Sequence, residues 1–273
     1  MSETVVPGYE DPELLRRIAI AAERNGLGAH RSAYPAPQAN WRSIRITAAV
    51  FAGLVVIAVI GFSADIEALA ALGLYPGVIA GFMLIIGGVR MLKYDNRYTG
   101  ARLDLYERGL VMAYRGREHV ARYDTVEVFQ TITRHLRNGV HTHTTYHYRL
   151  TALDGTQVLL SEAFAGVDQW GPELQQAVTD AQLPVAAARV NAGERVDFGD
   201  LWITATEIGS RHKSAPWTRI ESLSVRDGTV SIGVEGKWLN LTNTPVGSIP
   251  NYFVFYSLAE HLRRQYGPAT AAR

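Results

Sequence analysis

The chain contains no cysteine among its 273 residues. This absence excludes a disulfide framework, a thiol nucleophile and a zinc site with cysteine ligands, and it fits a reducing compartment. Acidic and basic side chains nearly balance, with 27 Lys and Arg against 26 Asp and Glu and a formal net charge of +1. Balanced and dispersed charge gives no electrostatic reason to expect nucleic acid as a partner.

Catalytic signatures are missing as well. The sequence contains no G-x-G-x-x-G, no Walker loop, no H-E-x-x-H and no G-x-S-x-G, which are the motifs that hold phosphates, a zinc ion or a nucleophilic serine. We therefore expect a protein without enzymatic activity and without a cofactor.

Charge is also absent from two long apolar runs, Ile46–Phe62 and Ala70–Val89. A helix rises about 1.5 Å per residue, so about 20 apolar residues cross a hydrocarbon core of about 30 Å. The second run has that length and the first approaches it. We therefore predict a transmembrane hairpin over 44–92, with helices at 46–62 and 70–89 and a turn at Ser63–Leu69. The lack of ionisable side chains inside both runs argues against a proton relay or an ion pathway.

Basic residues near the membrane ends indicate the orientation of this hairpin. The turn carries Asp65 and Glu67 but no lysine or arginine. Basic residues flank the hairpin on both outer sides, namely Arg31, Arg42 and Arg45 before it and Arg90, Lys93, Arg97 and Arg102 after it. The pattern predicts a multi-pass protein of the cell (plasma) membrane with both termini in the cytoplasm.

Three glycines of the second run, Gly73, Gly77 and Gly81, recur at four-residue spacing and therefore share one helix face. Small residues let another helix approach closely. Two interpretations follow, which are packing against the first helix of the hairpin and a homo-oligomer interface.

The polar residues 1–43 are predicted to form an N-terminal cytoplasmic segment. Apolar residues at helical spacing between Asp11 and Leu27 indicate a short amphipathic helix, and Asp11 is available as its cap. Pro35 and Pro37 follow, and they are typical of an extended linker.

Short strands are predicted from Ala101 onward. Alternation indicates a strand at 103–106, and further strands are predicted at 109–114, 120–123, 126–132, 144–153 and 156–161, with turns at Asn138–Gly139 and Asp154–Gly155. A helix then begins near Asp168, and Pro184 is expected to end it. These elements make a first domain at 101–184.

The order recurs in a second domain at 193–266. Strands are predicted at 201–207, 213–217, 220–225, 229–234 and 238–242, and Asn251 is expected to cap a closing helix that reaches about Gln265. Trp202, Trp217 and Trp238 are interpreted as core or rim residues. The stretch 267–273 is expected to be a disordered tail.

A local phrase repeats between the two domains. Tyr123–Val128 matches Trp217–Ser222 in pattern, with an aromatic residue, two polar residues, a β-branched aliphatic residue and Glu. A degenerate internal duplication of roughly 90 residues explains the match. The predicted fold class is a membrane α+β protein, with a two-helix transmembrane hairpin and two small antiparallel β-barrels or sandwiches. Each of these is closed by a C-terminal helix that covers exposed strand groups.

This arrangement looks like tandem pleckstrin-homology-like (PH-like) domains, and the chain resembles the actinobacterial membrane proteins grouped as DUF6585. The resemblance is carried by Gly26-Leu27-Gly28 before the hairpin, the stretch Leu105–Leu110, the phrase around Trp217 and Ile220, and Ile249-Pro250-Asn251 before the last helix. The family has no established activity, so the resemblance implies an architecture and no mechanism.

Two basic loops occupy corresponding places in the two predicted domains, Arg115-Gly116-Arg117 and Arg211-His212-Lys213. In PH domains the loop between the first two strands often carries basic residues that bind phosphoinositide phosphates. Arginine suits bidentate contacts with phosphate and lysine a point contact. Arg115, Arg117, Arg211 and Lys213 are therefore candidates for binding anionic lipid headgroups. The alternatives are solvated charge and a contact with a protein.

Three histidines, His141, His143 and His147, lie on one face of a predicted strand, with His135 nearby. Three imidazoles can hold a catalytic zinc ion. However, no carboxylate lies within the run, and about 20 Å of extended strand separates His141 from His147, which is too far for one metal ion. An exposed polar strand face is the simpler interpretation, with a metal site and a pH-responsive surface as alternatives.

These features together favour a membrane-anchored interaction or scaffold protein. Its tandem domains are expected to meet a protein partner or anionic lipids at the inner membrane face, and the second apolar helix offers a route to homo-oligomers. The alternative hypothesis is a metal-dependent, membrane-proximal enzyme that uses the histidine strand.

Overall fold

The computed structural model describes residues 11–36, 41–98, 101–137, 140–161, 164–211 and 213–268. The chain divides into two compact units. One is a helical hairpin, Ala36–Thr99, and the other is a β-rich unit made of Met1–Pro35 and Gly100–Arg273. The turn predicted at Asn138–Gly139, Pro37 of the predicted linker and residues 269–273 of the predicted tail lie outside the described residues.

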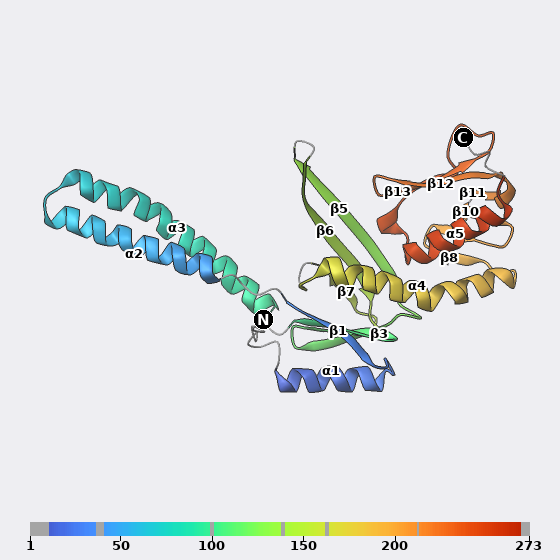
Figure 1. Ribbon diagram of the computed structural model, residues 1–273, viewed down its shortest axis with the longest axis horizontal. Coiled ribbons are helices and arrows are strands. Elements are labelled where there is room, and N and C mark those ends of the chain that lie inside the picture. The colour runs from blue at the N-terminus through green and yellow to red at the C-terminus, as the bar shows by residue number, and fades with distance from the viewer. Residues whose placement is uncertain are drawn as a thin grey trace. The chain divides into compact units, whose positions relative to one another are not determined.

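The hairpin consists of α2 (Trp41–Ser63) and α3 (Glu67–Tyr98) (Figure 1). Both helices are long and apolar enough to cross a membrane by length and composition, over Arg42–Ser63 and Ala71–Arg90. Only 11% and 17% of the most apolar window of each helix is buried within the protein. A soluble core helix would bury most of such a surface, so these two helices leave a large apolar area without protein cover.

The first four-stranded sheet has the order β1-β2-β3-β4, with β1 at His30–Pro35, β2 at Arg102–Tyr106, β3 at Gly109–Tyr114 and β4 at Arg117–Arg122. The strand β1 precedes the hairpin in the chain and β2 follows it, yet the two pair antiparallel. Residues 30–35, expected to lead into an extended linker, therefore form a sheet strand. Local sequence did not reveal it because its pairing partner lies beyond the whole hairpin.

Both faces of this sheet are covered. The helix α1 (Pro12–Arg24) lies along one face (Figure 1), and Asp11 caps it by accepting the Glu13 N–H at 3.0 Å. Leu14, Ile18 and Ala22 of α1 form a cluster with apolar side chains of β2 and β3. Because the sheet is sandwiched, all five residues of β2 are buried, including its polar ones.

The next three strands, β5 (Val128–Arg137), β6 (Val140–Thr151) and β7 (Gln157–Leu160), form a second sheet. The strand β7 pairs only with Tyr148–Thr151 of β6, so the outer part of β5 and β6 continues as a two-stranded ribbon beyond the sheet (Figure 1). The predicted turn at Asp154–Gly155 is confirmed, with the Asp154 carboxylate accepting the Thr156 N–H at 2.9 Å.

The helix α4 (Val167–Asn191) differs from the prediction because it continues through Pro184. Proline lacks the N–H that would bond the carbonyl of Asp180, but burial of the residues beyond it outweighs that loss. Ala186 and Val190 are both buried in the core of the following strands. The alanine-rich stretch expected to be an irregular join is therefore the second half of one long helix.

Seven further strands and a helix follow. They are β8 (Val196–Phe198), β9 (Leu201–Ile203), β10 (Glu207–Ser210), β11 (Lys213–Pro216), β12 (Ile220–Arg226), β13 (Thr229–Val234), β14 (Thr242–Pro245) and α5 (Tyr252–Tyr266). The first four form one sheet and the last three another. The single strand predicted at 201–207 is divided by a turn, and the predicted strand 238–242 is mostly loop. Trp202 and Trp217 are buried, whereas Trp238 is fully exposed.

The same order of elements thus occurs twice: a four-stranded sheet, a three-stranded sheet and a helix. We call β1–β7 with α4 the first module and β8–β14 with α5 the second module. The repeated phrase follows the fourth strand in both modules and runs into the fifth strand. All four sheets among the described residues are antiparallel and open, and none closes into a barrel.

Candidate functional site at the basic end of the first sheet

The basic turn of the first module lies at a defined end of its sheet. The chain leaves β1 at Pro35 and re-enters β2 at Arg102, and these two residues are opposite each other in the ladder. Because successive strands are antiparallel, the turn between β3 and β4 lies at that same end, and Tyr114 pairs with Arg117 across it. The sheet end that connects to the apolar hairpin therefore carries the basic turn.

Backbone geometry fixes how this turn presents its side chains. Arg115 and Gly116 both have positive φ, 51° and 73°, as a two-residue turn that follows the twist of its strands requires. The Arg115 guanidinium lies 5.2 Å from the centroid of the Tyr114 ring. Arg115 and Arg117 are exposed, and within the described part of the chain neither forms an ion pair. Two guanidinium groups are thus open to an anion.

The second basic turn has the same topological place, between β10 and β11, but a different charge environment. Arg211 donates to the Asp200 carboxylate through Nε at 2.9 Å and Nη2 at 2.8 Å, and this hydrogen bonding raises the pKa of Arg211. Lys213 is exposed, and His212 lies outside the described residues. The two turns are therefore not equivalent, because Asp200 already neutralises the arginine of the second.

A polar cluster along β2 depends on β1 and was missed by sequence reasoning. The Asp104 side chain is 2% exposed, and it accepts two hydrogen bonds from Arg102, at 2.7 and 2.8 Å. His30 Nε2 lies 2.9 Å from the same carboxylate. Burial, followed by the Asp104 charge, raises the pKa of Tyr106 to about 12. These groups line a cleft beside α1. The Arg102 guanidinium is hydrogen-bonded to the Asp104 carboxylate, so it adds little net positive charge to the basic end of the sheet.

The histidines lie on the β5–β6 ribbon rather than around one point. His143 stacks on His135 of the neighbouring strand with ring centroids 4.1 Å apart, while His141 Nε2 contacts Thr144 Oγ1 at 2.9 Å. His147 is opposite Thr131 in the ladder. Within the residues that the structure describes, no three potential metal ligands come together, so the geometry offers nothing to the metal hypothesis.

The glycine stripe of α3 faces α2. A Cβ at Gly73 would lie 2.4 Å from the Ala58 nitrogen, and one at Gly81 would lie 3.1 Å from the Phe51 ring. At Gly77 it would lie 3.7 Å from the Leu54 Cβ. The close approach of the two helices therefore uses these glycines inside the hairpin.

A polar joint connects the two modules at Asn251, the N-cap position of α5. Its side chain accepts the Val128 N–H at 2.8 Å and donates to the Val126 carbonyl at 3.0 Å and to Gln182 Oε1 at 2.7 Å. Its own N–H donates to the Val128 carbonyl at 2.9 Å. The predicted capping side-chain bond is absent, because the side chain is directed to the first module instead.

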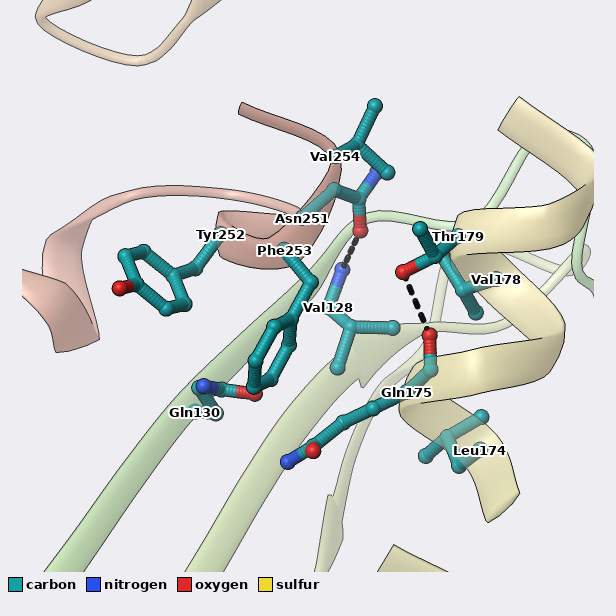
Figure 2. A pocket seen from close by; sticks show the side chains of 10 residues that line it. All are labelled: Val128, Gln130, Leu174, Gln175, Val178, Thr179, Asn251, Tyr252, Phe253 and Val254. Carbon is teal, nitrogen blue, oxygen red and sulfur yellow. Dashed lines mark hydrogen bonds between the residues drawn. The ribbon is translucent and has the colours of Figure 1, made fainter. Parts of the chain in front are cut away.

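A small pocket opens beside this joint. Figure 2 shows residues of β5, α4 and the start of α5 around it, with the Asn251 side chain directed to Val128. The wall is mainly apolar, and Phe253 and Gln130 are among the residues that line it. The pocket is a product of the docking between modules, and it carries no charged side chain among its lining residues.

The described features define a class of protein, namely a mixed α+β chain in which an apolar helical hairpin interrupts the first of two successive β-modules. The chain belongs to a family of unknown function, DUF6585, whose model matches residues 15–267. This match confirms the family assignment indicated by the sequence. Comparisons with curated proteins and with solved structures found no match.

Proposed function

We propose that this protein is a membrane-anchored, non-enzymatic interaction protein that presents two PH-like modules at the cytoplasmic membrane surface. In this proposal α2 and α3 span the bilayer, and the basic turn of the first module contacts anionic lipid headgroups. The proposal is supported by the two apolar helices and by the recurrence of seven strands followed by one helix.

The observation that carries the headgroup contact is the position of Arg115 and Arg117. Their turn lies at the sheet end from which the chain enters the hairpin and to which it returns. If α2 and α3 span a bilayer, the short connections at 36–40 and 99–101 keep that end within reach of the headgroups, since a residue spans at most about 3.6 Å. Juxtamembrane basic residues gain about 1 kcal/mol each at an anionic surface.

The orientation in the proposal rests on the distribution of Lys and Arg around the two helices. Asp65 lies in the turn between α2 and α3 and Glu67 begins α3, whereas the basic residues lie at the opposite end of the hairpin, in the first turns of α2, in the last turns of α3 and in the chain beyond them. This distribution favours cytoplasmic termini. A reporter fused after Arg273 tests this point. It should be active only if it functions in the cytoplasm, and activity of an exported reporter would reverse the proposed topology.

The headgroup contact is tested with the full-length protein in nanodiscs of phosphatidylcholine, with and without phosphatidylglycerol. Hydrogen exchange of the peptide that covers 114–118 is the readout. We expect slower exchange in the anionic discs, and we expect the difference to disappear in an R115Q/R117Q variant. The R211Q/K213Q variant is the matched control, because Asp200 already engages that turn, and it should retain the difference.

Equal exchange over 114–118 in both kinds of disc would overturn the headgroup contact while leaving the anchoring intact. In that case a protein partner at the inner membrane face becomes the better explanation for two arginines that form no ion pair among the described residues. Loss of the difference in the R211Q/K213Q variant alone would instead assign the contact to the second module.

A further inference from the structure

The loop between β13 and β14 exposes two large apolar side chains at its tip. Trp238 is 100% exposed and its neighbour Leu239 is 75% exposed. Tryptophan is strongly buried on average in folded proteins, and the two other tryptophans of this module are 8% and 1% exposed. Neither side chain is buried in the core of the module, although a core or rim position was expected for Trp238.

Both sides of the loop are fixed to the sheet. At its start the Glu235 N–H donates to the Arg219 carbonyl at 2.8 Å and the Lys237 N–H to the Val234 carbonyl at 3.0 Å. At its end Leu241 is buried, and its N–H donates to the Ile232 carbonyl at 2.8 Å. The apolar pair is therefore held out from the surface by a braced loop.

The chemistry of the tip matches a lipid–water interface. The indole ring combines a large apolar surface with one N–H donor, so tryptophan concentrates at the headgroup level of membranes, and leucine favours the hydrocarbon just below. Lys237 precedes the pair, and its ammonium can stay among anionic headgroups while its stem lies along the apolar surface. The two apolar helices of this chain are also long and apolar enough to cross a bilayer, so the proposed anchoring places a lipid surface next to the protein.

We propose that Trp238 and Leu239 form a second membrane contact, by which the second module inserts its loop tip into the interface of the bilayer. This contact rests on the proposed anchoring by α2 and α3, but it does not depend on the basic turn of the first module. It assigns the second module a lipid surface as its ligand, with apolar insertion as the main interaction and Lys237 as an electrostatic supplement.

The absence of native cysteine allows a direct test with single-cysteine variants of the full-length chain. The positions are Leu239 at the tip, Val56 in α2 and Ser224 on the exposed surface of β12, each labelled with an environment-sensitive fluorophore. The protein is reconstituted into phosphatidylcholine and phosphatidylglycerol vesicles with and without lipids that carry a quencher. We expect blue-shifted and quenchable emission at Leu239 and Val56, and water-like emission at Ser224.

The three labels separate the two proposals. Quenching at Val56 with water-like emission at Leu239 would overturn the loop contact and keep the anchoring, leaving a protein as the occupant of the tip. Water-like emission at Val56 would overturn the anchoring itself. A W238Q substitution in the Leu239-labelled chain should reduce the quenching without unfolding the protein, because the Trp238 side chain is fully exposed. Unchanged quenching would remove Trp238 from the contact.

Discussion

Asn251 should be the residue on which the docking of the two modules depends most. Its side chain makes three hydrogen bonds to the first module, between 2.7 and 3.0 Å. At about 1 kcal/mol of net stabilisation for each bond, removing the side chain should weaken the joint by about 3 kcal/mol. The residue also has φ of 48°, a conformation that costs an alanine about 1–2 kcal/mol but costs glycine little.

Two substitutions separate these contributions. The N251G variant removes the side-chain bonds and tolerates the backbone conformation, whereas N251A removes the bonds and adds backbone strain. The Val128 amide, which donates to Asn251, reports on the joint by hydrogen exchange in the full-length protein. A loss of about 3 kcal/mol corresponds to exchange faster by on the order of 100-fold if the joint opens locally. We expect a further increase of roughly tenfold in N251A.

The matched control is N240G, since the Asn240 side chain donates to Asn243 of the adjoining strand β14 at 2.9 Å, within the second module. It should leave exchange at Val128 unchanged. Unaltered exchange at Val128 in N251G would refute the inference that this side chain joins the modules. Equal exchange in N251A and N251G would refute the argument from backbone strain.

Two further predictions concern the hairpin and α5. A chain that carries both L54C and G77C should form a disulfide rapidly, because the two Cβ atoms would lie 3.7 Å apart. Adding G73A should slow disulfide formation, because the new Cβ would lie 2.4 Å from the Ala58 nitrogen of α2. Adding G88A should not slow it, because a Cβ at Gly88 meets nothing within 4 Å. Hydrogen bonds from the two arginines that follow in α5 lower the pKa of Glu260 to about 2. The ionised Glu260 carboxylate therefore stabilises the fold fully above its ordinary pKa near 4.5, and this stabilisation is lost as the pH falls towards 2. The free energy of unfolding, measured by chemical denaturation, should depend less on pH across that window in E260Q than in the protein with Glu260.

The insertion of the hairpin between two paired strands has a consequence for folding. The strand β1 cannot pair until β2 has been made, after the entire hairpin. Once in place it is held from both sides, because Ser32 and Tyr34 donate to the Glu173 carboxylate of α4 at 3.1 Å or slightly more. A fragment that begins at Ala101 would lack this strand together with α1, so the full chain is the appropriate sample for binding experiments.

The sequence by itself determined the elements whose signals are local. The two apolar runs define α2 and α3 because hydrocarbon length and lack of charge are properties of a single segment. A strand such as β13 follows from its alternation and from neighbouring turn residues, and Asp227-Gly228 adopts the positive φ values that its turn requires. The family relationship was also readable from short motifs, and the family match confirmed it.

Only the tertiary structure decided the features that depend on partners distant in the chain. The strand β1 exists because β2 and Glu173 meet it, and α4 passes Pro184 because burial of Ala186 and Val190 in the second module outweighs one missing hydrogen bond. The difference between the two basic turns comes from Asp200, and the exposure of Trp238 comes from its place in the loop between β13 and β14. A local pattern shows what a segment can form, whereas the fate of each side chain depends on what the rest of the fold brings to it.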